Sequence, residues 1–159
     1  QQIGLFPNMT VAQNICVVPK LLKYSKEQCD QIVRDMLAMV EMPYEQYANK
    51  YPSEMSGGQQ QRVGVARALV VDPEIIFADE PTGNLDSNTS REVMELMQQV
   101  VHEKQQTLVM VTHDNHLASF ADRIFHIIDG KIVRIDDMTG KSKEEREKEE
   151  KKREEEASI

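Results

Sequence analysis

The most informative segment of the chain begins Ser56-Gly57-Gly58-Gln59-Gln60-Gln61-Arg62-Val63 and ends Ile75-Ile76-Phe77-Ala78-Asp79-Glu80-Pro81-Thr82-Gly83-Asn84-Leu85-Asp86. Its first half is a polar, glycine-rich turn that opens into a helix, and such a helix start offers backbone N–H groups and a positive dipole end to an anion. Its second half is a short apolar run that stops at two carboxylates. A strand that ends in this way places one carboxylate where it can hold Mg²⁺ through water, and the next where it can polarise an attacking water. Together the two halves indicate nucleotide chemistry.

In this order and at this spacing, these residues resemble the ATP-binding cassette (ABC) ATPases. The resemblance implies a signature motif at Ser56 to Gln60, a Walker B strand at Ile75 to Asp79 and a D-loop at Gly83 to Asp86. It also implies ATP and Mg²⁺ as cofactors, with Asp79 holding the metal and Glu80 acting as the catalytic base. The implied nucleotide contacts are Ser56, Gly57, Gly58, Gln59 and Asp86. Taken singly, the turn would be only a loop and the Asp-Glu pair only a solvated strand end.

The resemblance gives roles to two more residues. Gln1, judged by its distance from Pro7, takes the place of the Q-loop glutamine that reaches Mg²⁺ and the attacking water. His113 follows an apolar run, and ligands in open α/β sheets gather at the carboxyl ends of strands. The resemblance makes His113 the switch histidine that touches the γ-phosphate. A metal site shared by His113 and His116 is a weaker alternative.

The implied fold is an α/β, P-loop NTPase-like ABC ATPase domain, present in part, with parallel core strands and a helical signature subdomain. We expect the partial ATPase domain to cover residues 1–137, with the helical subdomain at about 8–70 and the remainder of the catalytic core at about 71–137. A charged tail, either helical or disordered, follows at 138–159. Its segment from Lys141 to Glu156 holds seven Lys or Arg and eight Glu, so there is almost nothing in it to bury.

Apolar periodicity, capping signals and turn residues place the elements. Helices are predicted from near Thr10, from Ser25 to about Glu41, from Gln59 to Val71, from a Thr89–Glu92 capping box, and over Leu117–Asp122. Buried parallel strands are predicted at Ile75–Ala78 and Thr107–Thr112, and a hairpin at Ile124–Ile128 and Lys131–Ile135 around Asp129-Gly130.

Composition narrows the class of protein. The 159 residues suffice for one domain, and the net charge of −8 argues against a nucleic-acid-binding surface. No apolar run approaches the roughly 20 residues that a membrane-spanning helix needs. The two cysteines, Cys16 and Cys29, form no metal-type pair, which favours a reducing, cytosolic compartment.

The sequence contains no Gly-x-x-x-x-Gly-Lys-Ser/Thr loop, the Walker A motif of this family. Gly140-Lys141-Ser142 imitates its end, but Ile135 stands where the first glycine is required. We therefore expect the chain to be the C-terminal part of a larger ATPase domain that alone binds ATP poorly and does not hydrolyse it. Without neighbouring strands, exposed apolar surface and marginal stability are also expected.

In the intact parent, the resemblance implies an ATPase subunit that powers an ABC transporter by ATP-driven dimerisation. Its partners would be a second ATPase domain, arranged head to tail, and transmembrane permease subunits, with no nucleic acid. It would lie in the cytoplasm, peripheral to the inner face of the cell membrane. The alternatives are a soluble ABC ATPase acting on ribosomes or DNA, and a non-catalytic remnant that acts by partner binding. Residues 1 to about 70 resemble quaternary-amine importers and Ala78 to Asp86 resembles lipoprotein-release and export systems, so the cargo and the direction of transport stay open.

Overall fold

The computed structural model describes residues 4–142, 145–146 and 148. The chain divides into two compact units, a first unit that ends at Val111 and a C-terminal unit that begins at Thr112. Within the described ranges, no helix is both long and apolar enough to cross a membrane.

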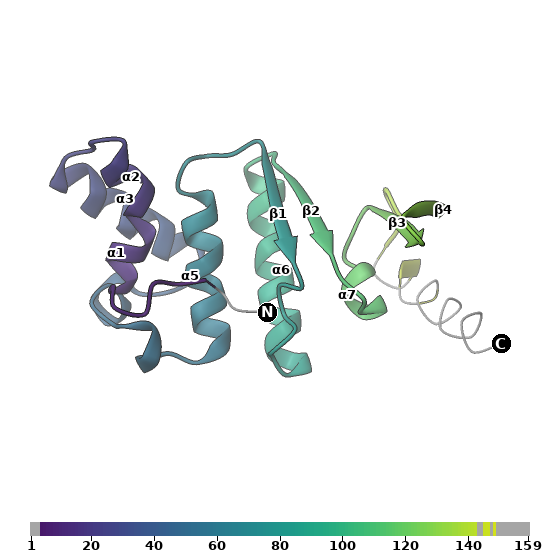
Figure 1. The fold of residues 1–159 in the computed structure, drawn as a ribbon, viewed down its shortest axis with the longest axis horizontal. Coiled ribbons are helices and arrows are strands. Elements are labelled where there is room, and N and C mark those ends of the chain that lie inside the picture. Colours follow the sequence, from purple (N-terminus) through teal and green to yellow (C-terminus); the bar gives the residue numbers. More distant parts are fainter. Residues whose placement is uncertain (1–3, 143–144, 147, 149–159) are drawn as a thin grey trace. The chain divides into compact units, whose positions relative to one another are not determined.

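The first unit begins with helices joined by tight turns (Figure 1). They are α1 (Val11–Ile15), α2 (Val17–Leu21), α3 (Lys26–Met39), α4 (Tyr44–Tyr47), the 3-10 helix η1 (Pro52–Glu54) and α5 (Gly57–Leu69). The side chains of Thr10, Ser25 and Ser56 cap α1, α3 and α5, each in a capping box with a glutamine three residues later. The helices predicted from near Thr10 and from Ser25 are therefore confirmed. The helix predicted from Gln59 begins earlier, at Gly57, because Ser56 is its cap.

Helix α5 lies at the centre of the first unit's core. It contacts α1, α3 and α6 (Ser87–Glu103), and Figure 1 shows it between the N-terminal helices and α6. Val63, Ala66 and Leu69 on its inner face are buried. They join a single apolar cluster with Val11, Ile15, Cys16, Cys29, Val33, Met36, Leu37, Val40, Met42, Ala48, Met55, Leu96 and Val100.

Two strands follow, β1 (Ile75–Asp79) and β2 (Thr107–Val111), and they pair in parallel. Ile75 lies opposite Thr107, and the register runs without a shift to Asp79 opposite Val111. A parallel pair needs a crossover connection, and α6 provides it. The predicted parallel core strands are thus confirmed.

The prediction that these strands are buried is wrong for one of their two faces. Ile75 is 50% exposed and Phe77 is 77% exposed, whereas Ile76 packs against the core cluster. Successive side chains of a strand point to opposite faces, and in the described part of the chain helices cover only the face that carries Ile76. Val109 and Val111 add to the open face, so the expected exposed apolar surface is confirmed.

The predicted start of α6 is also wrong. The sequence suggests Thr89 as the N-cap, but Asp86 occupies that position and α6 begins at Ser87. The Asp86 carboxylate accepts hydrogen bonds from the first free N–H groups of the helix, which leaves Thr89 inside the first turn.

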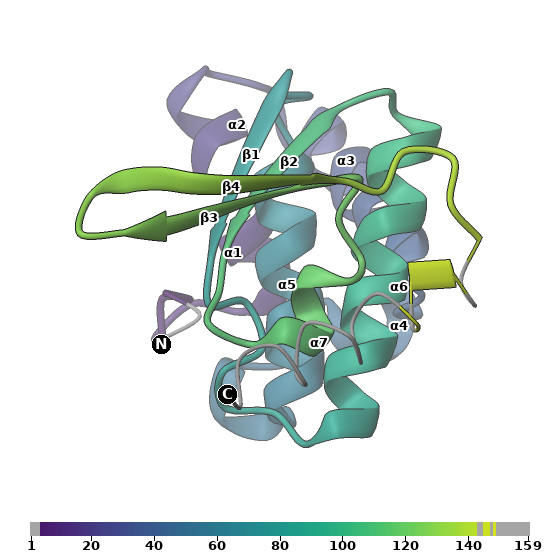
Figure 2. The same ribbon diagram turned by 90° about the vertical axis from the view of Figure 1, so that its right-hand side faces the viewer.

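The C-terminal unit contains α7 (Asn115–Ala118) and an antiparallel hairpin of β3 (Arg123–Ile128) and β4 (Lys131–Asp137), seen in Figure 2. The predicted hairpin is confirmed. Asp129 has a φ of 49° and Gly130 a φ of 72°, and two positive φ values in a two-residue loop are those of the type I′ turn that matches strand twist. Helix α7 overlaps the predicted Leu117–Asp122 helix only in part: it begins earlier, at Asn115, because Asp114 caps it, and it ends at Ala118.

The beginning of the charged tail is held against the C-terminal unit. The Arg146 guanidinium donates to the carbonyl oxygens of Phe120 and Ala121, at 3.2 and 3.0 Å, and to the Asp122 carboxylate at 2.8 Å. The remainder of the predicted tail lies outside the described residues. The division of the chain into an ATPase domain at 1–137 and a tail at 138–159 stays a prediction.

Candidate active site

The predicted signature turn, Ser56 to Gln59, forms the N-terminus of α5. The Ser56 Oγ accepts a hydrogen bond from the Gln59 N–H at 3.3 Å, and the Ser56 N–H donates to Gln59 Oε1 at 3.0 Å. Gln59 Nε2 also donates to the Tyr47 hydroxyl at 3.2 Å. Ser56 and Gln59 therefore cap the helix start, and Tyr47 supports Gln59. The N-terminus of this 13-residue helix has the backbone N–H groups and dipole end that an anion needs.

Asp79 and Glu80 lie at the C-terminal end of β1. Asp79 is exposed, and the Glu80 N–H extends the strand ladder by donating to the Val111 carbonyl oxygen at 2.9 Å. Glu80 has a φ of 45°, in the left-handed region that costs a residue with a Cβ about 1–2 kcal/mol. Strain of this kind gathers at functional sites, and here it interrupts the strand geometry at the predicted catalytic base.

The donor set at this strand end fits Mg²⁺. Magnesium is usually held by one or two protein carboxylates and completes its octahedron with water and phosphate oxygens, which matches an exposed Asp79. Across the ranges that the structure describes, no group of three or more His, Cys, Asp and Glu gathers into a metal-binding cluster. The structure therefore gives no support to a metal site built on His113 and His116.

Asp86 has a structural role that the sequence analysis missed. Its Oδ1 accepts from the N–H groups of Asn88 and Thr89, both at 3.1 Å, and its Oδ2 accepts from the Thr89 hydroxyl at 2.6 Å. The Thr89 hydroxyl, and after it the Thr89 N–H, lower the pKa of Asp86 below its ordinary value. The signal was available, because Asp is among the preferred N-cap residues.

The two glycines of the signature turn bring the start of α5 against Leu85, which precedes α6, and against Thr89 in the first turn of α6. Gly57 approaches Leu85 and Gly58 approaches Thr89 so closely that a Cβ on either glycine would collide with its neighbour. The structure thus brings the signature turn and the predicted D-loop together.

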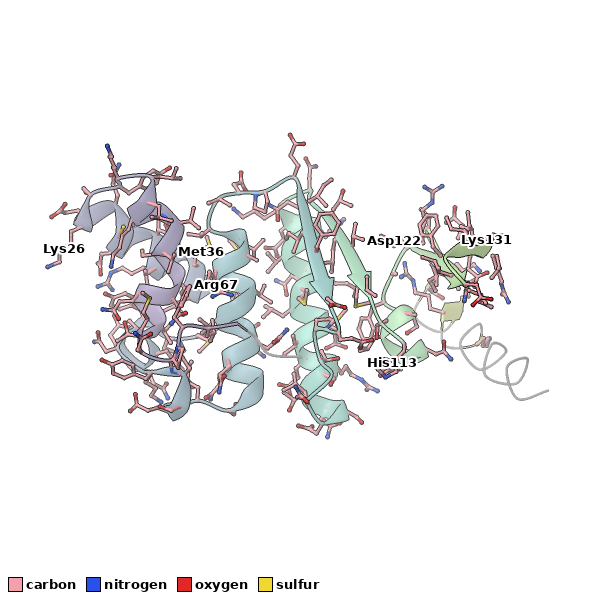
Figure 3. All side chains as sticks on the ribbon, viewed as in Figure 1. Lys26, Met36, Arg67, His113, Asp122 and Lys131 are labelled. Atoms are coloured by element: carbon pink, nitrogen blue, oxygen red, sulfur yellow. The ribbon has the colours of Figure 1, made fainter. Side chains whose placement is uncertain are left out.

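His113 and Gln1 are different cases. His113 belongs to the C-terminal unit and precedes α7 (Figure 3), where Asp114 donates its N–H to Thr112 Oγ1 at 3.1 Å and caps α7 through the His116 N–H at 2.8 Å. Asp79 and Glu80 belong to the first unit. The predicted role of His113 beside them stays a prediction. Gln1 lies outside the described residues, and its role also stays a prediction.

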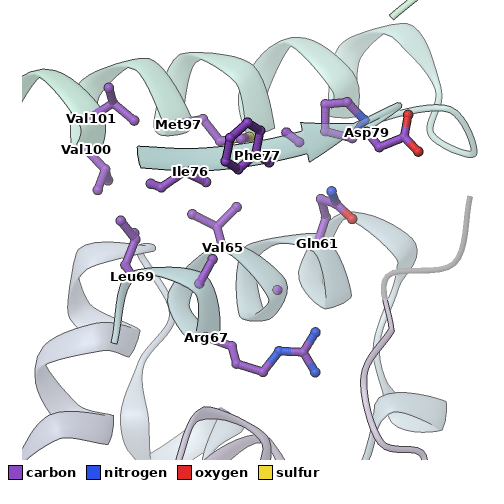
Figure 4. A pocket seen from close by; sticks show the side chains of 14 residues that line it. Gln61, Val65, Arg67, Leu69, Ile76, Phe77, Asp79, Met97, Val100 and Val101 are labelled. Carbon is purple, nitrogen blue, oxygen red and sulfur yellow. The ribbon is translucent and has the colours of Figure 1, made fainter. Parts of the chain in front are cut away.

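A cavity of about 250 Å³ opens between α5, β1 and α6 (Figure 4). Leu69 and Val100 lie at its apolar end, and Gln61 and Asp79 lie at the other. The volume falls short of the roughly 300–1,000 Å³ that enclose a small-molecule ligand. Asp79, the predicted Mg²⁺ ligand, therefore lines the cavity, but the cavity is too small to hold a nucleotide by itself.

Asn14 and Arg67 are two further polar residues with structural contacts that the sequence analysis does not predict. Asn14 is fully buried, and its amide exchanges hydrogen bonds with both the N–H and the carbonyl of Phe6, at 2.8 and 3.2 Å. Arg67 donates to the Gly4 carbonyl oxygen at 2.8 Å. Both residues fix the segment that follows the predicted Q-loop glutamine. A lone Asn in the apolar run around α1 was the only signal in the sequence.

Known proteins are similar to this chain in sequence and in fold. The family model described as ABC transporter matches residues 1–83. The choline transport ATP-binding protein OpuBA of Bacillus subtilis is 46% identical over 136 residues, which are 85% of this chain and 35% of that protein. The lipoprotein-releasing system ATP-binding protein LolD of Syntrophotalea carbinolica is 41% identical over 128 residues, which are 80% of this chain and 56% of that protein. A solved dimeric post-hydrolysis state of the ATP-binding cassette MJ0796, bound to ADP and Pi, matches with a TM-score of 0.73 at 40% identity and covers 88% of this chain and 61% of that one.

The chain belongs to the ABC transporter family. Its fold is that of an ABC ATPase domain, with the P-loop NTPase-like parallel strands and the helical subdomain that the signature segment predicts. It spans about 35% of the length of the choline transport relative.

Proposed function

We propose that this chain supplies the signature turn, the Walker B strand and the D-loop of an ATP-hydrolysing subunit that powers an ABC transporter. One observation carries the proposal: the Asp79–Glu80 pair ends a parallel strand in the unit that also presents the capped signature turn. Membership of the family and the names of the relatives, which are ATP-binding proteins of transport systems, support it.

Glu80 is assigned as the general base that takes a proton from the attacking water. Glu80 is half-buried and follows the last residue of β1. Its backbone lies in the left-handed region between two hydrogen bonds. On one side its N–H extends the strand ladder, and on the other the Gly83 N–H donates to the Glu80 carbonyl oxygen at 3.2 Å. A positioned base contributes about 10²–10⁴ in rate. Asp79 orients Mg²⁺, which when bound neutralises charge on the phosphates.

The signature turn is assigned to the phosphates of a second ATPase domain. In a head-to-tail dimer, Ser56 to Gln59 close on the γ-phosphate that the partner domain holds, Asp86 couples the two sites, and Gln1 and His113 contact the γ-phosphate from the chain's own side. The match to a dimeric ATP-binding cassette supports this arrangement.

Permease subunits are the proposed membrane partners, and they place the protein in the cytoplasm at the inner face of the membrane. The helical part offers an apolar surface for them, because Leu21 and Leu22 at the end of α2 and Tyr24 beyond it are exposed. Exposed apolar patches of this kind mark interaction sites.

Glu80→Gln in the complete ATPase tests the assignment. The amide keeps the shape of the side chain but cannot accept the proton, so ATP binding and dimer closure should persist while hydrolysis falls by about 10²–10⁴. Turnover of [γ-³²P]ATP and dimerisation by light scattering measure the two effects. Glu103→Gln, at the exposed end of α6, is the matched control and should leave turnover unchanged. Undiminished hydrolysis by Glu80→Gln would remove Glu80 from the mechanism.

Co-purification decides between transport and the soluble alternative. Recovery of the protein with integral membrane subunits in detergent supports a transporter ATPase. Co-sedimentation with ribosomes in their place would overturn the transport proposal.

A further inference from the structure

The N-termini of α5 and α6 meet through a glycine that has no room for a side chain. A Cβ added to Gly58 would lie well inside 3.0 Å of Thr89 Cγ2, a separation that real Cβ atoms essentially never show. Gly58 is buried, and its φ lies outside the left-handed region, so its backbone would accept any residue. Space, and not backbone conformation, therefore requires glycine at this position.

Thr89 uses its second branch to hold Asp86. While Cγ2 touches Gly58, Oγ1 donates to Asp86 Oδ2 at 2.6 Å, and the Thr89 N–H donates to Asp86 Oδ1 at 3.1 Å. The two branches sit on one Cβ, so they turn together about χ1. Any shift of the methyl group away from Gly58 therefore moves the hydroxyl away from Asp86.

The adjacent contact is softer. A Cβ on Gly57 would lie 2.9 Å from Leu85 Cδ2, but that atom is the far end of a flexible side chain and can move aside. The Gly58–Thr89 contact is thus the rigid connection between the two helix starts.

We propose that Thr89 is a positioning residue that connects the signature turn to the D-loop, so that Gly58 and Asp86 move as one body. This role rests on the proposed function and deepens it. It assigns to Thr89 the coupling between the signature turn, which closes on one nucleotide, and Asp86, which couples that site to the second nucleotide. It also gives Gly58 a reason to be glycine that does not involve a phosphate.

Thermal unfolding of the protein without nucleotide tests the contact. Ala is a better helix former than Gly, so Gly58→Ala would raise Tm if the site had room. We expect it to lower Tm by roughly 3–10 °C, because an overpacked contact forces the backbone or rotamers to move. Thr89→Ser removes Cγ2 but keeps the hydroxyl, and the double variant Gly58→Ala/Thr89→Ser should recover most of the lost Tm.

Gly83→Ala is the matched control for the thermal measurement. Its added Cβ would lie 3.6 Å from the Glu80 carbonyl oxygen, an ordinary contact, so the same substitution should leave Tm nearly unchanged. A Gly58→Ala variant as stable as the wild type, or a double variant as unstable as Gly58→Ala, would overturn the proposed contact.

ATPase kinetics of the complete protein test the coupling. Thr89→Val keeps the methyl contact and loses the hydroxyl bond to Asp86, so we expect kcat to fall roughly threefold to tenfold while KM for ATP stays within about twofold. An unchanged kcat in Thr89→Val would overturn Thr89 as the connection. A wild-type protein without ATPase activity would instead refute the proposed function, and the thermal result would stand apart from it.

Discussion

Cys16 shows how one buried group makes stability depend on pH. It is 2% exposed, between α1 and α2, and its thiol donates to the Cys29 carbonyl oxygen at 3.3 Å. Burial, and after it the contact with Cys29, raises the pKa of the Cys16 thiol from 9.0 to about 12. Thiolate is the reactive form of cysteine, so the folded protein keeps Cys16 protonated and unreactive at neutral pH.

The free energy of unfolding should therefore fall as the pH rises through the window between 9.0 and about 12. In that window the unfolded thiol has lost a proton that the folded thiol keeps, so alkali favours the unfolded state by up to about 1.4 kcal/mol per pH unit. Below pH 9 the contribution is fully present. Urea titrations at pH 8 and pH 10 should show that the wild type loses about 1 kcal/mol more than Cys16→Ala between these pH values. Equal losses in the two proteins would contradict the raised pKa.

Three residues of the predicted motifs cap helices in addition to their predicted nucleotide roles. Ser56 and Gln59 were predicted as nucleotide contacts and also form a capping box, and Asp86 was predicted in the D-loop and also caps α6. The capping role follows from a side-chain oxygen that accepts from helix N–H groups, and the nucleotide role stays a prediction. The sequence cannot show that Thr89 lies between Asp86 and Gly58, since that depends on how two helices pack.

At the scale of elements, the sequence predicts what local interactions decide. Helix α3 begins where Ser25 places it, and the hairpin turns at Asp129-Gly130, because capping and turn geometry involve only neighbours in the chain. The burial of β1 was mispredicted because the apolar run is the same whether one face or both are covered. What covers Phe77 is decided by elements distant in the sequence, and no local pattern reports it.

Arg146 attaches the start of the charged tail to residues 120–122, and the charge pattern of the tail does not predict this contact. Its side chain is only 16% exposed and makes hydrogen bonds to the carbonyl oxygens of Phe120 and Ala121 and to the Asp122 carboxylate, and the adjoining Met138 N–H donates to the Asp122 carbonyl oxygen at 2.7 Å. In the sequence, Arg146 is one of many charged residues in a solvated run. Five donors in a planar fork suit this set of acceptors, which an ammonium group cannot match.

Arg146→Ala should lower the free energy of unfolding of the C-terminal unit by about 1–2 kcal/mol, because these acceptors lose a charged donor. Hydrogen exchange measured by mass spectrometry should show faster exchange at Met138. Arg146→Lys should recover less than half of the loss. Lys148→Ala is the control, because this exposed residue of the same segment should change stability by no more than about 0.5 kcal/mol. Equal effects of the two alanine variants would show that Arg146 anchors nothing.

At the scale of the whole molecule, the open face of β1 and β2 distinguishes this chain from a closed α/β domain. Ile76 and Phe77 are neighbours on one strand, yet Ile76 packs into the core and Phe77 is 77% exposed. Phe77→Thr should therefore change the free energy of unfolding by less than about 0.5 kcal/mol and reduce the binding of an apolar dye such as ANS. Ile76→Thr should cost about 1–3 kcal/mol, since it places a hydroxyl against the apolar core. A loss of stability in Phe77→Thr equal to that in Ile76→Thr would mean that this face is covered.

Nucleotide affinity is the property that depends most on the complete domain. The signature turn serves a partner's nucleotide in the proposed dimer, so the groups proposed to act on a nucleotide from the chain's own side are Asp79 and Glu80 at the end of β1, together with Gln1 and His113. The printed sequence has no Gly-x-x-x-x-Gly-Lys-Ser/Thr loop, whose bonds to charged phosphates contribute about 1.5–3 kcal/mol each. The absence of two or three such bonds removes on the order of 5 kcal/mol, which is more than about a thousandfold in affinity. Isothermal titration calorimetry of the 159-residue chain with Mg-ATP should accordingly detect no micromolar binding. A micromolar Kd would mean that the signature turn or the carboxylates of β1 hold the phosphates without that loop. The assignment of the signature turn to a nucleotide held by the partner domain would then be wrong.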